Sequence, residues 1–132
     1  MSVKHLATLR FAYATFKVSN ISRACSHQLV RHPHLSYLQR SQRYCNDAES
    51  GFVLPDSLAD NQVVFEKLLA DSLKVYKELI DYGVPKGDAR YVLPQAASTE
   101  LYVTGNFQAW TTSYATEPIR RPSRRLERLL FQ

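Results

Sequence analysis

Apolar side chains recur at three- and four-residue spacing between residues 60 and 82, while charged side chains fall mostly on the opposite helical face. The apolar face consists of Phe65, Leu68, Leu69, Ser72, Val75, Tyr76, Leu79 and Ile80. Asp60 or Asn61 can cap the start of this segment, and Gly83 can end it in a left-handed conformation. The pattern therefore predicts an amphipathic helix over residues 60–82.

Two shorter segments alternate between the two faces of an extended chain, which is typical of strands. In residues 10–19, one face consists of Ala12, Ala14, Phe16 and Val18. In residues 99–104, one face consists of Thr99, Leu101 and Val103. We predict a strand for each segment. Ser19 and Asn20 are expected to end the first strand, and Gly105 and Asn106 the second.

The segment between these strands begins with a short apolar period. Ile21, Cys25 and Leu29 recur every four residues and predict a helix over residues 21–31. Pro33 prevents this helix from continuing, because proline lacks the backbone N–H and disfavours a helical residue before it. Residues 32–46 are polar and have no convincing period, so we predict an exposed loop with room for one helical turn.

Proline and glycine also mark the later boundaries. Residues 51–58 are predicted to form a linker around Pro55. Pro85 occupies a preferred first-turn position and predicts a helix that ends before Pro94. Residues 107–110 are predicted to begin a third helix, and the apolar period is lost after Trp110.

The composition is that of a globular protein, and most of the net positive charge lies in one segment at the C-terminal end. The 132 residues are 45% hydrophobic and 22% charged, which predicts one folded domain and excludes collagen-like or wholly disordered structure. Of the formal net charge of +5, +4 falls in residues 118–132, where five arginines accompany one glutamate. A basic nucleic-acid-binding module is therefore a weak alternative, because no aromatic or groove-reading motif accompanies these arginines.

The two cysteines, Cys25 and Cys45, form no CxxC pair and predict neither a disulfide framework nor a zinc site. A reduced, cytoplasmic setting is the simplest interpretation. The N-terminal residues lack the apolar core of a signal peptide, and no apolar run has the length of about 20 residues that spans a bilayer. We therefore expect no membrane association.

The densest candidate chemistry lies in residues 31–44, which hold three arginines, two histidines, two serines and two tyrosines. Arginine suits phosphate and carboxylate groups, so this segment can hold a nucleotide or another planar anion. A solvated polar loop explains the same composition equally well. No carboxylate or cysteine joins His32 and His34 in a metal site, and no triad forms around Ser41. Arg90 alone is as consistent with a surface salt bridge.

Two blocks of sequence resemble the flavin-dependent thymidylate synthases. The first, NISRACSHQLVRHPHLSYLQRSQRY, carries Arg31, His32 and Ser41 at the spacing of the signature Arg-His-Arg, seven residues, Ser. The second is VPKGDARYVLPQAASTELYVTGNFQAW, and a long amphipathic helix separates the two blocks, as in the family. The resemblance covers roughly residues 12–110.

The resemblance implies a fold and a reaction. It implies an α+β domain over residues 1–117, in which an antiparallel sheet packs with helices in the thymidylate synthase-complementing fold, incomplete at both ends. The implied reaction is FAD-dependent methylation of dUMP to dTMP, with methylenetetrahydrofolate as the carbon donor and NADPH as the reductant. It also implies a cytoplasmic homotetramer with shared active sites, without nucleic-acid, membrane or metal partners.

The same resemblance assigns candidate site residues by matched position. The implied dUMP contacts are Gln28, Leu29, Val30, Arg31, Gln39, Arg40, Ser41, Gln42, Arg43 and Arg90. The implied FAD contacts are Arg31, His32, Pro33, Gln39, Asn106, Phe107 and Gln108. No catalytic residue is assigned, because the position of the family's catalytic arginine is occupied by Glu117.

Four departures from the family pattern bear on activity. Pro33 and Gln108 stand where the family has arginines, Glu117 reverses a charge, and the early flavin-binding segment is absent or reduced to residues 1–9. Codons for residues 111–118 permit His-Phe-Ile-Arg-Asn-Arg-Ala in another frame, with arginine at position 117. Our hypothesis is a frameshift near codon 110, so that residues 118–132 form a disordered or out-of-frame tail. The alternative function is a non-catalytic remnant that retains nucleotide or flavin binding or oligomerisation.

Overall fold

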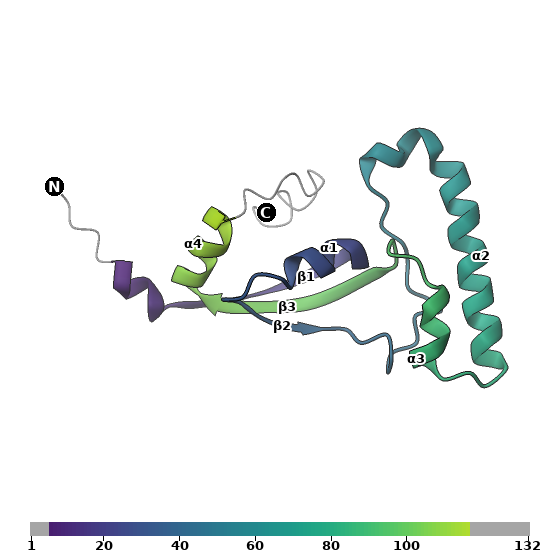
Figure 1. The fold of residues 1–132 in the computed structure, drawn as a ribbon, viewed down its shortest axis with the longest axis horizontal. Helices are drawn as coiled ribbons and strands as arrows, with labels where there is room; N and C mark the ends of the chain where they lie inside the picture. Colours follow the sequence, from purple (N-terminus) through teal and green to yellow (C-terminus); the bar gives the residue numbers. More distant parts are fainter. Residues whose placement is uncertain (1–5, 117–132) are drawn as a thin grey trace. The chain divides into compact units, whose positions relative to one another are not determined.

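The structure is a computed structural model that describes residues 6–116, with side chains described as far as residue 113 (Figure 1). Strands and helices are mixed along the chain, and the predicted α+β class is confirmed. The strands are β1 (Tyr13–Ser22), β2 (Ser36–Gln39) and β3 (Ser98–Asn106). The α-helices are α1 (Arg23–Leu29), α2 (Gln62–Asp81), α3 (Lys86–Ala89) and α4 (Phe107–Thr116). Short 3-10 helices are η1 (Leu6–Arg10), η2 (Asp56–Asn61) and η3 (Arg90–Val92). Glu117 and the predicted tail 118–132 lie outside the described residues.

The chain divides into two compact units, which are described separately. Within the described residues, the sheet unit comprises residues 6–19, Cys25–Gln39 and residues 100–116. The helical unit comprises Asn20–Ala24 and Arg40–Thr99.

Strand β3 is the central strand of a sheet with the order β1-β3-β2, as Figure 1 shows. Its predicted alternation is confirmed, since Leu101 and Val103 are buried while Tyr102 is exposed. The strand continues two residues beyond the prediction, and Gly105 belongs to its buried face. Phe107 then begins α4, so β3 delivers the chain directly into that helix.

The strand predicted over 10–19 is confirmed in part as β1, which begins at Tyr13 because Arg10 belongs to η1. Ser19 and Asn20 do not end it. Asn20 has a φ of 55°, a left-handed conformation that asparagine tolerates better than most residues. The buried residues Val18 and Ile21 lie three positions apart, so the alternation shifts by one residue, as at a β-bulge. Ile21 consequently belongs to the strand, and α1 begins only at Arg23 instead of at the predicted residue 21.

The loop prediction for residues 32–46 is wrong in one part, because Ser36–Gln39 form strand β2. This strand pairs antiparallel with β3 and places Ser36 opposite Thr104 and Gln39 opposite Leu101. Four residues are too few to show a hydrophobic period, and Leu38 is exposed. The strand exists because β3 offers its backbone donors and acceptors along that edge.

Helix α4 starts where predicted but continues past Trp110 to Thr116, although the apolar period is lost. The hydroxyls of Thr111 and Thr112 donate to the carbonyls of Phe107 and Gln108, four residues earlier. Trp110 anchors the helix to the sheet unit. Its indole N–H lies 3.1 Å from the Gly105 carbonyl, and its ring meets Phe16 edge to face at 5.2 Å.

In the helical unit, the predicted long helix is confirmed as α2. Leu69 and Tyr76 are its buried side chains, but Leu68 and Val75, which were predicted on the same face, are 57% and 42% exposed. Asn61 occupies the N-cap position without a side-chain capping hydrogen bond. Gly83 has a φ of 82° and donates its N–H to the Ile80 carbonyl at 2.9 Å, which confirms the predicted glycine end.

The helix predicted from Pro85 is confirmed as α3, which tightens into η3 and ends at Val92. The predicted linker 51–58 is partly ordered. Phe52 forms an isolated antiparallel bridge with Ala97, and η2 begins at Asp56. These segments hold the residues near position 43 and those near position 90 within one compact unit.

Candidate functional site

The candidate site residues fall into both units. The sheet unit holds Gln28, Leu29, Val30, Arg31, His32, Pro33, Gln39, Asn106, Phe107 and Gln108. The helical unit holds Arg40, Ser41, Gln42, Arg43 and Arg90.

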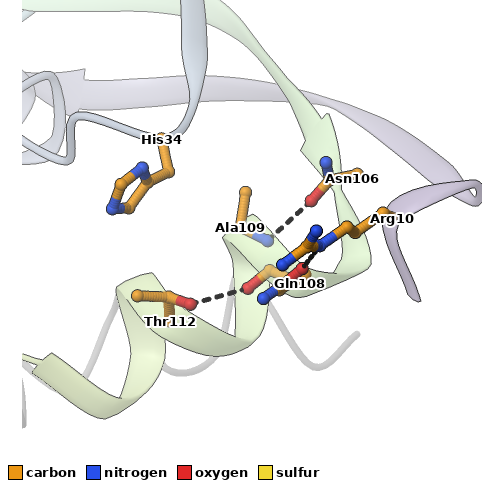
Figure 2. Close-up of a pocket in the computed structure, with 6 residues that line it drawn as sticks. All are labelled: Arg10, His34, Asn106, Gln108, Ala109 and Thr112. Atoms are coloured by element: carbon orange, nitrogen blue, oxygen red, sulfur yellow. Dashed lines mark hydrogen bonds between the residues drawn. The ribbon is translucent and has the colours of Figure 1, made fainter. Parts of the chain in front are cut away.

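The sheet unit contains a pocket of about 310 Å³ where β3 passes into α4 (Figure 2). Its lining residues are Arg10, His34, Asn106, Gln108, Ala109 and Thr112. Two of them, Asn106 and Gln108, are predicted FAD contacts, and the structure brings them together with Arg10 from the end of η1. The sequence prediction missed Arg10, His34, Ala109 and Thr112.

Hydrogen bonds fix the polar groups around this pocket. The Oδ1 atom of Asn106 accepts the backbone N–H of Ala109 at 2.8 Å, so the side chain caps the first turn of α4. The Nε–H of Arg10 donates to Oε1 of Gln108. The Thr112 hydroxyl donates to the Gln108 carbonyl at 2.9 Å. Figure 2 shows these three hydrogen bonds around the first turns of α4.

The electrostatic character of the pocket is positive. Among its lining residues, Arg10 carries a permanent charge and none is a carboxylate. The first turn of α4 also lies at the pocket, and a helix N-terminus favours negative charge. The arrangement is suited to an anionic or strongly hydrogen-bond-accepting ligand.

The other candidates of the sheet unit do not line this pocket. Arg31 and Pro33 are exposed and follow α1 in a turn, where the Arg31 N–H bonds to the Gln28 carbonyl at 3.2 Å. Gln39 donates from Nε2 to the buried hydroxyl oxygen of Ser26 at 2.8 Å. Tyr37 donates to the His32 carbonyl at 3.1 Å, and burial raises the pKa of its phenol.

In the helical unit, two candidate arginines that are far apart in sequence each lie against Gly87 of α3. The Nε–H of Arg90 donates to the Gly87 carbonyl at 3.0 Å. The side chain of Arg43 lies along the same glycine, because a Cβ atom at position 87 would be 3.7 Å from its Nε. Ser41 accepts the Arg43 backbone N–H on its hydroxyl at 3.3 Å, which orders the turn that presents Arg43.

A buried carboxylate holds another part of this region. Asp47 is only 3% exposed, lies 3.5 Å from the guanidinium of Arg40, and accepts the Ser50 hydroxyl at 3.0 Å. Arg40 also donates to the Asn46 carbonyl at 3.0 Å. These contacts stabilise the fold around Asp47 and tie up part of the Arg40 guanidinium.

Arg23 belongs to the same cluster and was missed from the sequence. Burial lowers its pKa, the charge of Asp47 raises it, and the positive charge of Arg90 lowers it again. The available signal was its position at the start of α1, where a cation is unfavourable unless other groups compensate for it. The helical unit thus places Arg23 and Arg40 near one buried acid, with Arg90 close enough to Arg23 to influence its charge.

Within residues 6–116, no three histidine, cysteine, aspartate or glutamate side chains gather as metal ligands. None of the helices in this part of the chain combines the length and apolar character required to cross a membrane.

Comparison with known proteins gives one consistent result. The family model described as "Thymidylate synthase complementing protein" matches residues 1–117. The flavin-dependent thymidylate synthase of Pyrococcus furiosus is 41% identical over 111 residues, which cover 79% of this chain and 46% of the relative. That of Geobacter sulfurreducens is 46% identical over 111 residues, with 80% and 48% covered. That of Mycobacteroides abscessus is 38% identical over 128 residues, with 83% and 51% covered. The chain therefore spans about half the length of these relatives.

Proposed function

Because the chain belongs to the thymidylate synthase complementing protein family, we propose that it acts in flavin-dependent methylation of dUMP to dTMP. The match over residues 1–117 carries the proposal. It bears out the family inferred from the block around Arg31 and Ser41. Methylenetetrahydrofolate as the carbon donor and NADPH as the reductant are part of the proposal.

The pocket at the β3–α4 junction fits a polar, phosphate-bearing part of FAD. Its donors come from the guanidinium of Arg10 and the side-chain amides of Asn106 and Gln108, with no carboxylate to repel an anion. FAD, when bound, supplies the hydride-transfer chemistry. Arg31, His32, Pro33, Gln39 and Phe107 remain proposed contacts that complete the flavin site.

For dUMP, the supporting observation is that the side chains of Arg43 and Arg90 both lie against Gly87. Arg90 uses its Nε–H on Gly87, and the guanidinium has further N–H donors that suit a phosphate. Ser41 adds a hydroxyl beside Arg43. The remaining proposed dUMP contacts are Gln28, Leu29, Val30, Arg31, Gln39, Arg40 and Gln42.

The family resemblance also underlies a proposed homotetramer in the cytoplasm with active sites shared between subunits. Exposed apolar side chains on α2, which include Val63, Val64 and Leu68, support association of this helix with another copy of the chain. A catalytic arginine is not assigned, because position 117 is a glutamate.

The proposal is tested on the purified full-length chain. Flavin content, oligomeric mass and dUMP-dependent NADPH oxidation are measured together with dTMP formation. We expect bound FAD, a mass of several chains, and turnover that Arg43→Gln and Arg90→Gln abolish without changing flavin content. Lys77→Gln removes one charge from an α2 position outside the proposed site and is the matched control.

The same measurements separate the alternatives. Flavin and dUMP binding without turnover would identify the chain as a non-catalytic remnant of the family. A colourless monomer that takes up neither added FAD nor dUMP would contradict both.

A further inference from the structure

Arg10 lies in the last turn of the short helix η1, where the helix dipole favours a cation. It lies 98 residues before Gln108 in the sequence, yet its Nε–H donates to Oε1 of that glutamine. Helix η1 packs against α4, and Phe11 continues the turn by donating its N–H to the Thr8 carbonyl. The contact directs the guanidinium of Arg10 to the pocket at the start of α4, as Figure 2 shows.

The hydrogen bonds around the pocket determine which groups remain available to a ligand. Oδ1 of Asn106 accepts the Ala109 N–H, and Oε1 of Gln108 accepts from Arg10. In each amide the oxygen is therefore engaged, and the NH₂ group is the remaining polar atom. The pocket consequently offers N–H donors from three side chains. Ligands rich in acceptor oxygens, above all phosphate esters, match that set.

We propose that Arg10, positioned by Gln108, is a phosphate-binding residue of this pocket. The guanidinium supplies the charge and a planar set of donors for two phosphate oxygens. Gln108 acts as a positioning residue, because it fixes the guanidinium through Nε and leaves the terminal nitrogens to the ligand. The assignment rests on the proposed function only for the source of the phosphate, which we take to be the diphosphate of FAD.

The test compares ligands with and without phosphate on the full-length protein. Affinities for FAD, riboflavin, dUMP and inorganic diphosphate are measured by calorimetry for the wild type and for Arg10→Gln. We expect Arg10→Gln to weaken FAD binding by about tenfold or more, since a charge-assisted hydrogen bond is removed. Riboflavin, which has no phosphate, is expected to bind the two proteins equally.

Two variants examine the positioning role and one controls for charge. Gln108→Ala is expected to weaken FAD binding less than Arg10→Gln does. The double variant Arg10→Gln with Gln108→Arg returns a guanidinium to the pocket and is expected to recover most of the FAD affinity. Lys74→Gln removes an equal charge from an exposed position on α2 and is expected to leave all affinities unchanged. Thermal unfolding verifies that each variant is folded.

The outcomes distinguish the phosphate-binding role of Arg10 from the proposed flavin-dependent function. If the wild type binds no FAD but binds diphosphate through Arg10, the phosphate site stands and the flavin function fails. Loss of dUMP binding in Arg10→Gln, with FAD unaffected, would keep Arg10 as a phosphate residue and assign the phosphate to the substrate. Equal binding of FAD, dUMP and diphosphate by the wild type and Arg10→Gln, or no binding of any of them by the wild type, would overturn the proposal.

Discussion

Gly105 lies on the buried face of β3, where space for a side chain is restricted. A Cβ atom at this position would come within 2.5 Å of Cδ2 of Leu35, which is itself 7% exposed. We expect Gly105→Ala to lower the free energy of unfolding by about 1–3 kcal/mol, the usual cost of overpacking. Urea unfolding measures the change.

Gly51→Ala is the matched control for this substitution, because a Cβ atom at position 51 meets nothing within 4 Å. Its effect is expected to stay within about 0.5 kcal/mol, as for most surface substitutions. Equal stability of the two variants would show that Leu35 does not restrict position 105.

The thiol of Cys25 makes the stability of the folded protein depend on pH. Burial raises the pKa of its thiol above the ordinary value of 9.0, so the folded protein holds this proton more tightly than the unfolded chain does. The contribution to stability is present in full below pH 9.0 and is lost as the pH rises through the raised folded value. We expect wild-type stability to decline more steeply above pH 9 than that of Cys25→Ala.

Urea unfolding in reductant, repeated across this pH range, measures the difference. Parallel pH profiles for the wild type and Cys25→Ala would refute the role given to burial of Cys25.

At the scale of the element, two neighbouring leucines of α2 differ in burial. Leu69 is 4% exposed and Leu68 is 57% exposed. Leu69→Ala is expected to reduce the free energy of unfolding by about 2–5 kcal/mol at any protein concentration, because it leaves a cavity in the helical unit.

Leu68→Ala is the matched control and makes no such cavity. If α2 associates with another copy of the chain, the effect of Leu68→Ala grows with protein concentration, since association stabilises by mass action. Dilution series followed by thermal unfolding and sedimentation measure both responses. If Leu68→Ala lowered the free energy of unfolding as much as Leu69→Ala at every protein concentration, the difference in burial between the two positions would be contradicted.

At the scale of the whole molecule, most of the net charge belongs to the last 15 residues and not to the candidate sites. We expect a variant with glutamine at all five arginines of this segment to lose retention on DNA and to keep its flavin content. The positions changed are Arg120, Arg121, Arg124, Arg125 and Arg128. The slope of log K against log salt should become shallower by about 0.9 for each DNA phosphate that the variant no longer neutralises.

Retention on a DNA column across a salt gradient gives this slope, and absorbance gives the flavin content. The opposite result, a colourless variant with DNA binding unchanged, would place the tail in the ligand site.

The sequence by itself determined the elements whose signals are local. The apolar period of residues 60–82 and the glycine at its end specified α2, and strict alternation specified β3 with Leu101 and Val103 buried. The spacing of Arg31 and Ser41 specified the family, since a signature of residues and intervals is itself a one-dimensional property. These features depend on neighbours within about two helical turns or one short motif.

Tertiary structure decided the features that depend on distant partners. Strand β2 exists because β3 pairs with it. The positions of Arg10 and Gln108 in one pocket depend on the packing of η1 against α4.

The two candidate arginines Arg43 and Arg90 likewise reach the same glycine, Gly87, only through the fold of the helical unit. Long-range contacts of this kind leave no period in the sequence, because each partner satisfies its local pattern equally well without the other. The chemistry of the candidate site was therefore visible in residue types, and its geometry was decided by the fold.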